Sequence, residues 1–295
     1  MTTHLAFSPA AEPEATLAPL AELHPEEHHR FMAEFKSKAQ PVVLRGLQNN
    51  SVACREWSFE TIKARTPNIT VDLDVGDAMV TNGLTFKEMH LHDYFDAVAK
   101  GHGTEDGETL YLQGYDLLEL VPEMEHEVVP VPAFQDAAVR SLSRVWLGPG
   151  GTVTGYHSDL ADNILSQILG YKLVKIVSPD QADRVYKTKK YDPNGHACAI
   201  NADDWDRAAF PKFAEVEAHY VVLGPGDALF IPGGWFHYVR SLETSISVNT
   251  LGYTAKQMIV DKSIDLARRA LHNVGLLGDT CTCHMMVDGE RVARR

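Results

Sequence analysis

Cysteine is scarce in this chain, and several features that would narrow its class are missing. Only four cysteines occur in 295 residues, at positions 54, 198, 281 and 283, which does not make a disulfide framework. No window approaches the roughly 18 uninterrupted apolar residues of a membrane helix. The N-terminus has no basic segment followed by a continuous apolar stretch, so no secretory signal is evident. Together these absences predict a protein of the reducing cytoplasm.

Positive charge is also in deficit. The chain has 27 Lys and Arg against 40 Asp and Glu, a net charge of −13, which disfavours unspecific binding to nucleic acid. One exception is the basic run from Arg184 to Lys190, which is either a solvated loop or a site for an acidic partner. A hydrophobic content of 44% and a charged content of 23% are typical of a globular protein with a full core.

The N-terminal half mixes helix and strand patterns. Residues 1–20 are rich in Ala, Pro, Thr and Glu and predict a flexible lead-in. Amphipathic patterns and stop signals then predict helices at 25–39, 57–67 and 84–101, and apolar or alternating runs predict strands at 40–46 and 68–76.

The centre of the chain has a different character. From about 140 to 253 it consists of short strand-like runs broken by Gly and Pro, and no helix alternates with them, which favours a sandwich or barrel. After Tyr253 the pattern becomes helical. We therefore expect an α+β protein with a mainly β core: one domain over 21–253, its β core at about 140–253, and a C-terminal helical segment over 254–295. The apolar stripe of that segment comprises Ile259, Ile264, Leu266, Ala270, Leu271 and Val274.

Three side chains form a candidate metal site. His157 and Asp159 are two residues apart in GYHSD, so on a strand they point to the same face. His237, in IPGGWFHYV, offers a third ligand. Two histidines and one carboxylate leave open positions on the metal, as in non-haem iron(II) oxygenases. An H-x-D triplet also occurs by chance, but the Gly-rich turns before His157 and His237 suit a site at the rim of a small barrel.

Several motifs in order resemble the JmjC/cupin-8 family of iron(II)- and 2-oxoglutarate-dependent oxygenases, and within it the asparaginyl hydroxylases that inhibit hypoxia-inducible factor. The similarity covers most of residues 40–253, through QPVVLRG, YLQ, TGYHSD, NILSQILGYK, GDALFIPGGWFH and SVNTLGY. The resemblance implies a double-stranded β-helix of the jelly-roll or cupin type. It also implies that His157, Asp159 and His237 hold the catalytic iron(II).

The same resemblance implies a site for 2-oxoglutarate. Its distal carboxylate would meet Tyr111, Thr154 and Lys172, and a carboxylate that leaves water does need a cation and hydrogen-bond donors. Taken alone, Thr154 could be a packing residue and Tyr111 a core aromatic. Asn163 and Asn249 match polar positions on the co-substrate side. Strand parity does not separate Lys172 from Lys175, because both faces of GYKLVKIV are apolar.

The substrate side departs from the asparaginyl hydroxylases. Gly233 and Gly234 stand where those relatives have bulky residues, and Thr250-Leu251 replaces two aromatics, so the substrate is not carried over. Gln113, Gly234 and Trp235 are the candidate substrate residues, although Trp235 could equally fill the core.

The expected activity is hydroxylation of an unactivated C–H bond with O₂ and 2-oxoglutarate, giving succinate and CO₂; demethylation would follow if the carbon bore a methylated nitrogen. The substrate could be a protein or peptide side chain, an amino acid or a natural-product intermediate. Two alternatives are a zinc or manganese cupin isomerase and a non-catalytic binding module.

The C-terminal segment resembles the dimerisation element of this family. Its broad apolar stripe needs a cover, either its own barrel or a second subunit, and we expect a homodimer. Cys281, Cys283 and His284 form a small cluster of soft ligands without a second pair, for which an ordinary tail is the simpler interpretation.

Overall fold

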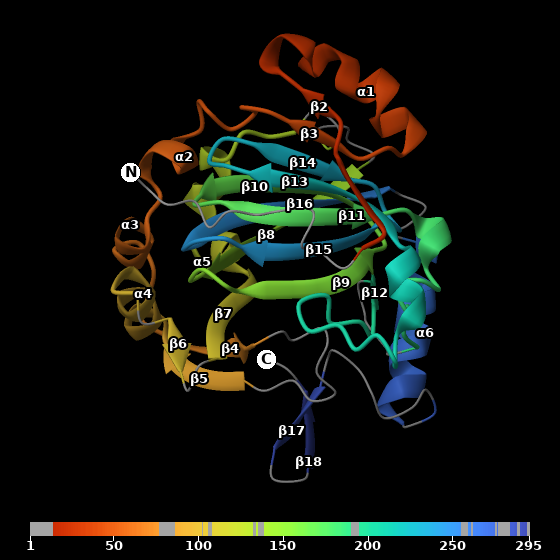
Figure 1. Ribbon diagram of the computed structural model, residues 1–295. Helices are drawn as coiled ribbons and strands as arrows, with labels where there is room; N and C mark the ends of the chain where they lie inside the picture. The colour runs from red at the N-terminus through yellow and green to blue at the C-terminus, as the bar shows by residue number, and fades with distance from the viewer. Residues whose placement is uncertain are drawn as a thin grey trace.

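A computed structural model describes residues 14–76, 86–101, 103–105, 108–131, 134, 139–189, 195–254, 259–260, 262–274, 276, 284–287 and 290–293. Two β-sheets dominate it (Figure 1). The apolar residues between them come from both sheets, for example Leu165 and Leu229 from one and Val174 and Val239 from the other. This layered β core confirms the expected cupin or jelly-roll architecture.

The larger sheet has the strand order β2-β3-β14-β10-β16-β8-β7-β4-β5, with β6 beside β7. Its strands are β2 (Glu22–Leu23), β3 (Val42–Leu44), β4 (Thr70–Val75), β5 (Phe86–His90), β6 (Thr104–Glu105), β7 (Glu108–Tyr115), β8 (Val139–Gly148), β10 (Asp162–Leu169), β14 (Ala228–Ile231) and β16 (Ser245–Thr254).

The smaller sheet has the order β1-β13-β11-β15-β9-β12. Its strands are β1 (Thr16–Pro19), β9 (Val153–Asp159), β11 (Lys172–Val177), β12 (Gly195–Ala197), β13 (Glu217–Leu223) and β15 (Phe236–Ser241). Every residue of β11 is buried, because one face of the strand meets the inter-sheet core and the other is covered. This explains why its sequence is apolar on both faces.

Short helices cover the outer face of the larger sheet, at one side of Figure 1. They are α2 (Val52–Glu56), α3 (Phe59–Lys63), α4 (Leu91–Ala99) and α5 (Leu117–Leu120). Ser51 and Ser58 begin α2 and α3 by accepting hydrogen bonds from the amides of Cys54 and Thr61. On the smaller sheet, the connection between β11 and β13 covers the outer face with Val185, Ile200 and Phe213.

Two expectations for the N-terminal half were wrong. The predicted helix at 84–101 begins instead as strand β5, which pairs with β4, and only Leu91–Ala99 is helical. Pairing with the preceding strand outweighs local helix propensity there. The expected flexible lead-in is ordered from Glu14 onward: β1 pairs in parallel with β13, and Glu14 is buried. Residues 1–13 lie outside the described part of the chain.

The first predicted helix, 25–39, is present as 3-10 turns at Pro25–Arg30 and Lys36–Lys38 around α1 (Phe31–Glu34). The C-terminal segment contains α6 (Lys262–Asn273) and the hairpin of β17 (His284–Val287) and β18 (Glu290–Ala293). No described helix combines the length and apolar character needed to span a lipid bilayer. Cys281 and Cys283 lie outside the described residues, as does the side chain of His284, so the small soft-ligand cluster stays untested.

Candidate metal centre

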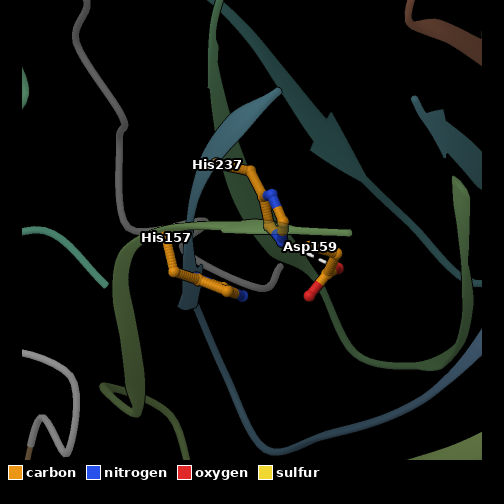
Figure 2. Close-up of side chains that lie close together, drawn as sticks. All are labelled: His157, Asp159 and His237. Carbon is orange, nitrogen blue, oxygen red and sulfur yellow. Dashed lines mark ion pairs between the residues drawn. The ribbon is translucent and has the colours of Figure 1, made fainter. Parts of the chain in front are cut away.

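The predicted triad converges. His157 on β9 and His237 on β15 are direct partners across the two antiparallel strands, with ring centroids 4.1 Å apart. Asp159 is two residues beyond His157, on the same face, and its Oδ2 lies 3.6 Å from Nε2 of His237 (Figure 2). One ligand atom from each residue can be chosen so that all lie within 4.8 Å of one another. The three side chains that the sequence analysis selected therefore lie close enough together to share one ion, and their role as ligands stays a prediction.

Backbone carbonyls fix both imidazoles in the form that a metal requires. Nδ1 of His157 lies 2.9 Å from the carbonyl oxygen of Gly155, and Nδ1 of His237 lies 3.2 Å from that of Trp235. A carbonyl only accepts, so each Nδ1 carries a proton and Nε2 is the ring nitrogen left to face a cation. Burial also lowers the pKa of His237 well below its ordinary value, and the nearby His157 adds to this effect. Neutral His237 is the state that binds a cation.

A chain of buried amides orients the carboxylate. Nδ2 of Asn163 donates to Oδ2 of Asp159 at 2.8 Å, and Nδ2 of Asn249 donates to Oδ1 of Asn163 at 3.1 Å. Burial raises the pKa of Asp159 above its ordinary value, while His157 and Asn163 oppose that rise. A bound cation would relieve this cost of burying the carboxylate. Asn163 and Asn249 thus reach the candidate metal site through Asp159, and their role on the co-substrate side stays a prediction.

The three predicted co-substrate anchors also meet. Lys172, at the start of β11, is 1% exposed, and its Nζ donates to the Tyr111 hydroxyl at 3.1 Å and to Oγ of Ser247 at 2.8 Å. The Thr154 hydroxyl contacts the Tyr111 hydroxyl, a contact that slightly opposes the large rise in the pKa of Tyr111 caused by burial. Among the described residues, no carboxylate pairs with Lys172. Burial therefore lowers the pKa of Lys172 to about 7.

A β-bulge brings Thr154 and His157 to the same side of the sheet. They are three residues apart on β9, so regular alternation would put them on opposite faces. Their partners on β15, Val239 and His237, are only two apart, and the register shifts between them. The extra residue in β9 restores a common face. Thr154 Oγ1 also donates to Oε1 of Gln113 at 3.4 Å, which places this candidate substrate residue beside the co-substrate anchors.

Ser247 is a member of this cluster that the sequence analysis missed. It lies on β16 two residues before Asn249 and two after Ser245, and all three side chains are buried. A strand whose polar residues alternate in this way, between Ile246 and Val248, carries a polar face into the interior. The sequence SISVN (residues 245–249) shows this alternation, so it could have predicted the polar interior face.

The remaining substrate candidates occupy different places. Gly234, with φ +86°, lines a cavity beside Asp159, and Cβ at this position would meet nothing closer than Pro179 Cγ at 3.9 Å. Trp235 packs against the inter-sheet core, and its Nε1 donates to the carbonyl of Ala39 at 3.1 Å. Trp235 therefore joins the N-terminal segment to the barrel, and its role toward substrate stays a prediction.

The donor set fits iron(II). Two imidazoles and one carboxylate are the donor set that would hold the ion and leave coordination positions open for other ligands. The histidine N–H groups and the Asp159 carboxylate are each held by a further hydrogen bond, as is usual for metal ligands. The interior also offers Lys172, a buried cation to which a co-substrate carboxylate could bind.

Comparisons with known proteins agree with this geometry. The profile of the cupin-like domain matches residues 28–251. Lysine-specific demethylase 8 of Danio rerio is 28% identical over 237 residues, which are 77% of this chain and 56% of the relative. JmjC domain-containing protein F of Dictyostelium discoideum is 34% identical over 171 residues, 50% of this chain and 36% of the relative. tRNA wybutosine-synthesizing protein 5 of Danio rerio is 29% identical over 175 residues, 57% of this chain and 52% of the relative.

These relatives support the JmjC resemblance but not the finer likeness to asparaginyl hydroxylases, which stays a prediction. The chain spans about half the length of the curated relatives it matches, so their whole activities do not transfer directly. The profile match extends from the first helical turns to β16 and includes all three candidate metal ligands. With its two facing sheets and its His-Asp-His cluster, the chain belongs to the cupin-like domain family.

Proposed function

We propose that this protein is an iron(II)- and 2-oxoglutarate-dependent oxygenase that uses O₂ to hydroxylate an unactivated C–H bond. One observation carries the proposal. The same barrel holds a three-ligand cluster and, separately, a buried lysine that has no carboxylate partner among the described residues. A cation kept in a protein interior without a counter-ion is costly unless a ligand supplies the missing charge.

Strand geometry supports a ligand that bridges these two places. Lys172 is the register partner of Ser241 on β15, four residues from His237, which corresponds to about 13 Å along the strand. The long lysine side chain covers part of that distance, and Thr154 lies opposite Val239, between the two ends. A short oxo-dicarboxylic acid can span the remainder, with one carboxylate at the metal and the other at Lys172, Tyr111 and Thr154.

The chain's own residues would position and shield the reacting groups. Lys172 would supply charge to the distal carboxylate, and the hydroxyls of Tyr111 and Ser247 would orient the ammonium group. Nδ1–H of each histidine holds its ring in place, and the apolar inter-sheet residues exclude water. Iron(II), when bound at the triad, supplies the oxidation chemistry that converts O₂ and 2-oxoglutarate to succinate, CO₂ and an oxygenated product.

The fate of the oxygenated product depends on the substrate, which we place among protein or peptide side chains, amino acids and natural-product intermediates. Simple hydroxylation is the default outcome. The names of relatives such as lysine-specific demethylase 8 favour a second candidate, demethylation, because hydroxylation of an N-methyl carbon gives a product that loses formaldehyde. Both outcomes use the same metal and the same co-substrate.

The proposal can be tested by mass spectrometry of the products formed in a cell extract. The protein would be incubated with iron(II), 2-oxoglutarate and a desalted cell extract, while succinate release and products 16 Da heavier, or 14 Da lighter after demethylation, are measured. The matched control is Asp159→Ala. A zinc or manganese isomerase would release no succinate, and a non-catalytic binding module would behave as the Asp159→Ala variant does. Either result would exclude the oxygenase assignment.

We also propose that α6 mediates homodimerisation. The stripe predicted from the sequence is exposed: Ile264, Leu266, Leu271 and Val274 are 53%, 69%, 42% and 70% accessible. The chain's own barrel therefore does not cover these side chains. A second copy of the same helix would cover an exposed apolar stripe of this kind, and symmetric pairing is the commonest arrangement of identical chains.

A further inference from the structure

The cavity that Gly234 lines beside Asp159 lies on the outer side of the smaller sheet, behind the strands that carry the candidate metal ligands. Its volume is about 340 Å³, and Ser158 and Phe236 contribute to its wall. These two residues are register partners, and each is adjacent in sequence to a metal ligand, His157 or His237. Since strand side chains alternate, Ser158 and Phe236 face away from the ligand side of the sheet. The cavity is thus separated from the Lys172 cluster by the sheet itself.

Among the described residues, the lining of this cavity includes one lysine. Lys187 and His196 line it from the connection that follows β11 and from β12. Asp159 is the one acidic residue among the described lining residues, and its carboxylate turns to the ligand side, where it contacts His237 and Asn163. No ion pair within the described part of the chain uses Lys187.

The rest of the lining combines apolar surface with one buried hydroxyl. Pro179, Ala182 and Phe236 supply the apolar part. Ser158 is 1% exposed, and no hydrogen bond joins its hydroxyl to another described residue. A hydroxyl buried in this way gains a partner if a ligand oxygen enters the cavity.

From this combination we infer that the cavity binds a small organic anion: an apolar body placed against Pro179, Ala182 and Phe236, with a carboxylate directed to Lys187 and Ser158. The volume is near the lower end of the range for small-molecule sites, which suits a single ring or a short chain. The site is distinct from the interior 2-oxoglutarate position and does not depend on the oxygenase assignment. Because Ser158 stands between two metal ligands in sequence, an occupant would contact the back of the metal-binding strand.

Benzoate and its neutral isostere benzamide are suitable probes. Binding of each would be measured by isothermal titration calorimetry and protein NMR on the full chain, with saturating 2-oxoglutarate and zinc(II) present to occupy the interior. We expect benzoate to bind more tightly than benzamide, and to shift resonances of Ser158, His196 and Gly234. Lys187→Ala should weaken benzoate about threefold to tenfold and leave benzamide unchanged.

Two further variants make the test specific. Lys189→Ala removes a charge two residues away that does not line the cavity, and it should leave benzoate affinity unchanged. Ala182→Leu narrows the cavity and should weaken both probes. Equal affinity for benzoate and benzamide, an unaffected Lys187→Ala variant, or competition between benzoate and 2-oxoglutarate would each overturn the inference. None of these results would bear on succinate release, so the two proposals fail separately.

Discussion

Lys172 and Lys175 stand three residues apart on β11, both are buried, and they face opposite sides of the smaller sheet. Nζ of Lys175 lies 2.8 and 3.1 Å from the two carboxylate oxygens of Glu14, whereas Lys172 contacts hydroxyl groups. Tyr156 also donates to Glu14, at 2.9 Å. One lysine is therefore a structural partner within a complete ion pair, and the other is available to an anion. We therefore expect Lys175 to contribute to the stability of the fold and Lys172 to the binding of a co-substrate.

The first prediction concerns the buried ion pair. Lys175→Met leaves the Glu14 carboxylate buried without its cation, which should lower the free energy of unfolding by about 3–5 kcal/mol. The double variant Glu14→Leu/Lys175→Met removes both charges and should recover most of that loss. Urea denaturation of the four proteins in this cycle measures the coupling. Additive losses in the double variant would contradict the pairing.

The second prediction is that replacing Lys172 has the opposite effect on the free energy of unfolding. Lys172→Met replaces an uncompensated buried cation by an apolar side chain of similar length, so the ligand-free protein should become more stable at pH 7. The same variant should lose measurable affinity for 2-oxoglutarate, because the distal carboxylate would enter the interior without a cation. Denaturation and calorimetric titration report the two effects separately. A variant that is destabilised yet binds 2-oxoglutarate normally would show that Lys172 is a structural residue.

The third prediction is a pH dependence with a defined sign. Burial lowers the pKa of Lys172 from 10.5 to about 7, so between these values the folded protein binds fewer protons than the unfolded chain. The resulting destabilisation is fully present below pH 7 and disappears as the pH rises toward 10.5, at up to about 1.4 kcal/mol per pH unit. The stability advantage of Lys172→Met should therefore shrink between pH 7 and pH 9.5. If the advantage stays constant over this range, burial of a charged Lys172 is not its cause.

The third prediction has a counterpart in binding, because Lys172 should take up a proton when the co-substrate binds. A carboxylate beside Lys172 raises its pKa, so at pH 8 the binding of 2-oxoglutarate should draw a proton from the buffer, and at pH 6 it should not. Calorimetry in two buffers of different ionisation enthalpy measures this uptake. Lys172→Met provides the control in which the buffer dependence is lost.

The sequence predicted the positions of the candidate metal ligands better than it predicted the N-terminal strands. His157 and Asp159 were predicted because spacing on one strand fixes their common face. The choice between Lys172 and Lys175 could not be made from strand parity, because both faces of β11 are buried and the partner of Lys175, Glu14, is 161 residues away in sequence.

The errors in the fold also arise from strand pairing, which local composition does not specify. The local sequence of Phe86–His90 predicts a helix, but in the structure this segment is a strand that pairs with β4. The lead-in is predicted to be flexible, but β1 pairs with the edge of β13. The residues within each segment do not indicate which strand it will pair with. The bulge that turns Thr154 inward likewise depends on how β9 pairs with β15.

The fourth prediction tests the metal centre without turnover. Zinc(II) or cobalt(II) should raise the thermal midpoint of the wild-type protein, because an ion that binds only the folded state stabilises it. Asp159→Ala should abolish this rise, and Asn163→Ala should weaken metal affinity about 10–100-fold because it frees the carboxylate. His196→Ala, on the neighbouring strand but outside the triad, should bind metal as the wild type does. A full response in Asp159→Ala would place the metal elsewhere.

The last prediction concerns the exposed helix. If α6 packs against its copy, the protein should run in light-scattering chromatography at twice the 32.7 kDa of one chain. Leu266 is 69% exposed, so Leu266→Glu should not disturb the monomer, but it would bury a charge in the interface and give a species of 32.7 kDa. Met32→Glu is the matched control, since Met32 is also exposed, at 46%, but lies on α1, remote in sequence from α6. A wild-type monomer, or a dimer that survives Leu266→Glu, would mean that the stripe on α6 is not the subunit contact.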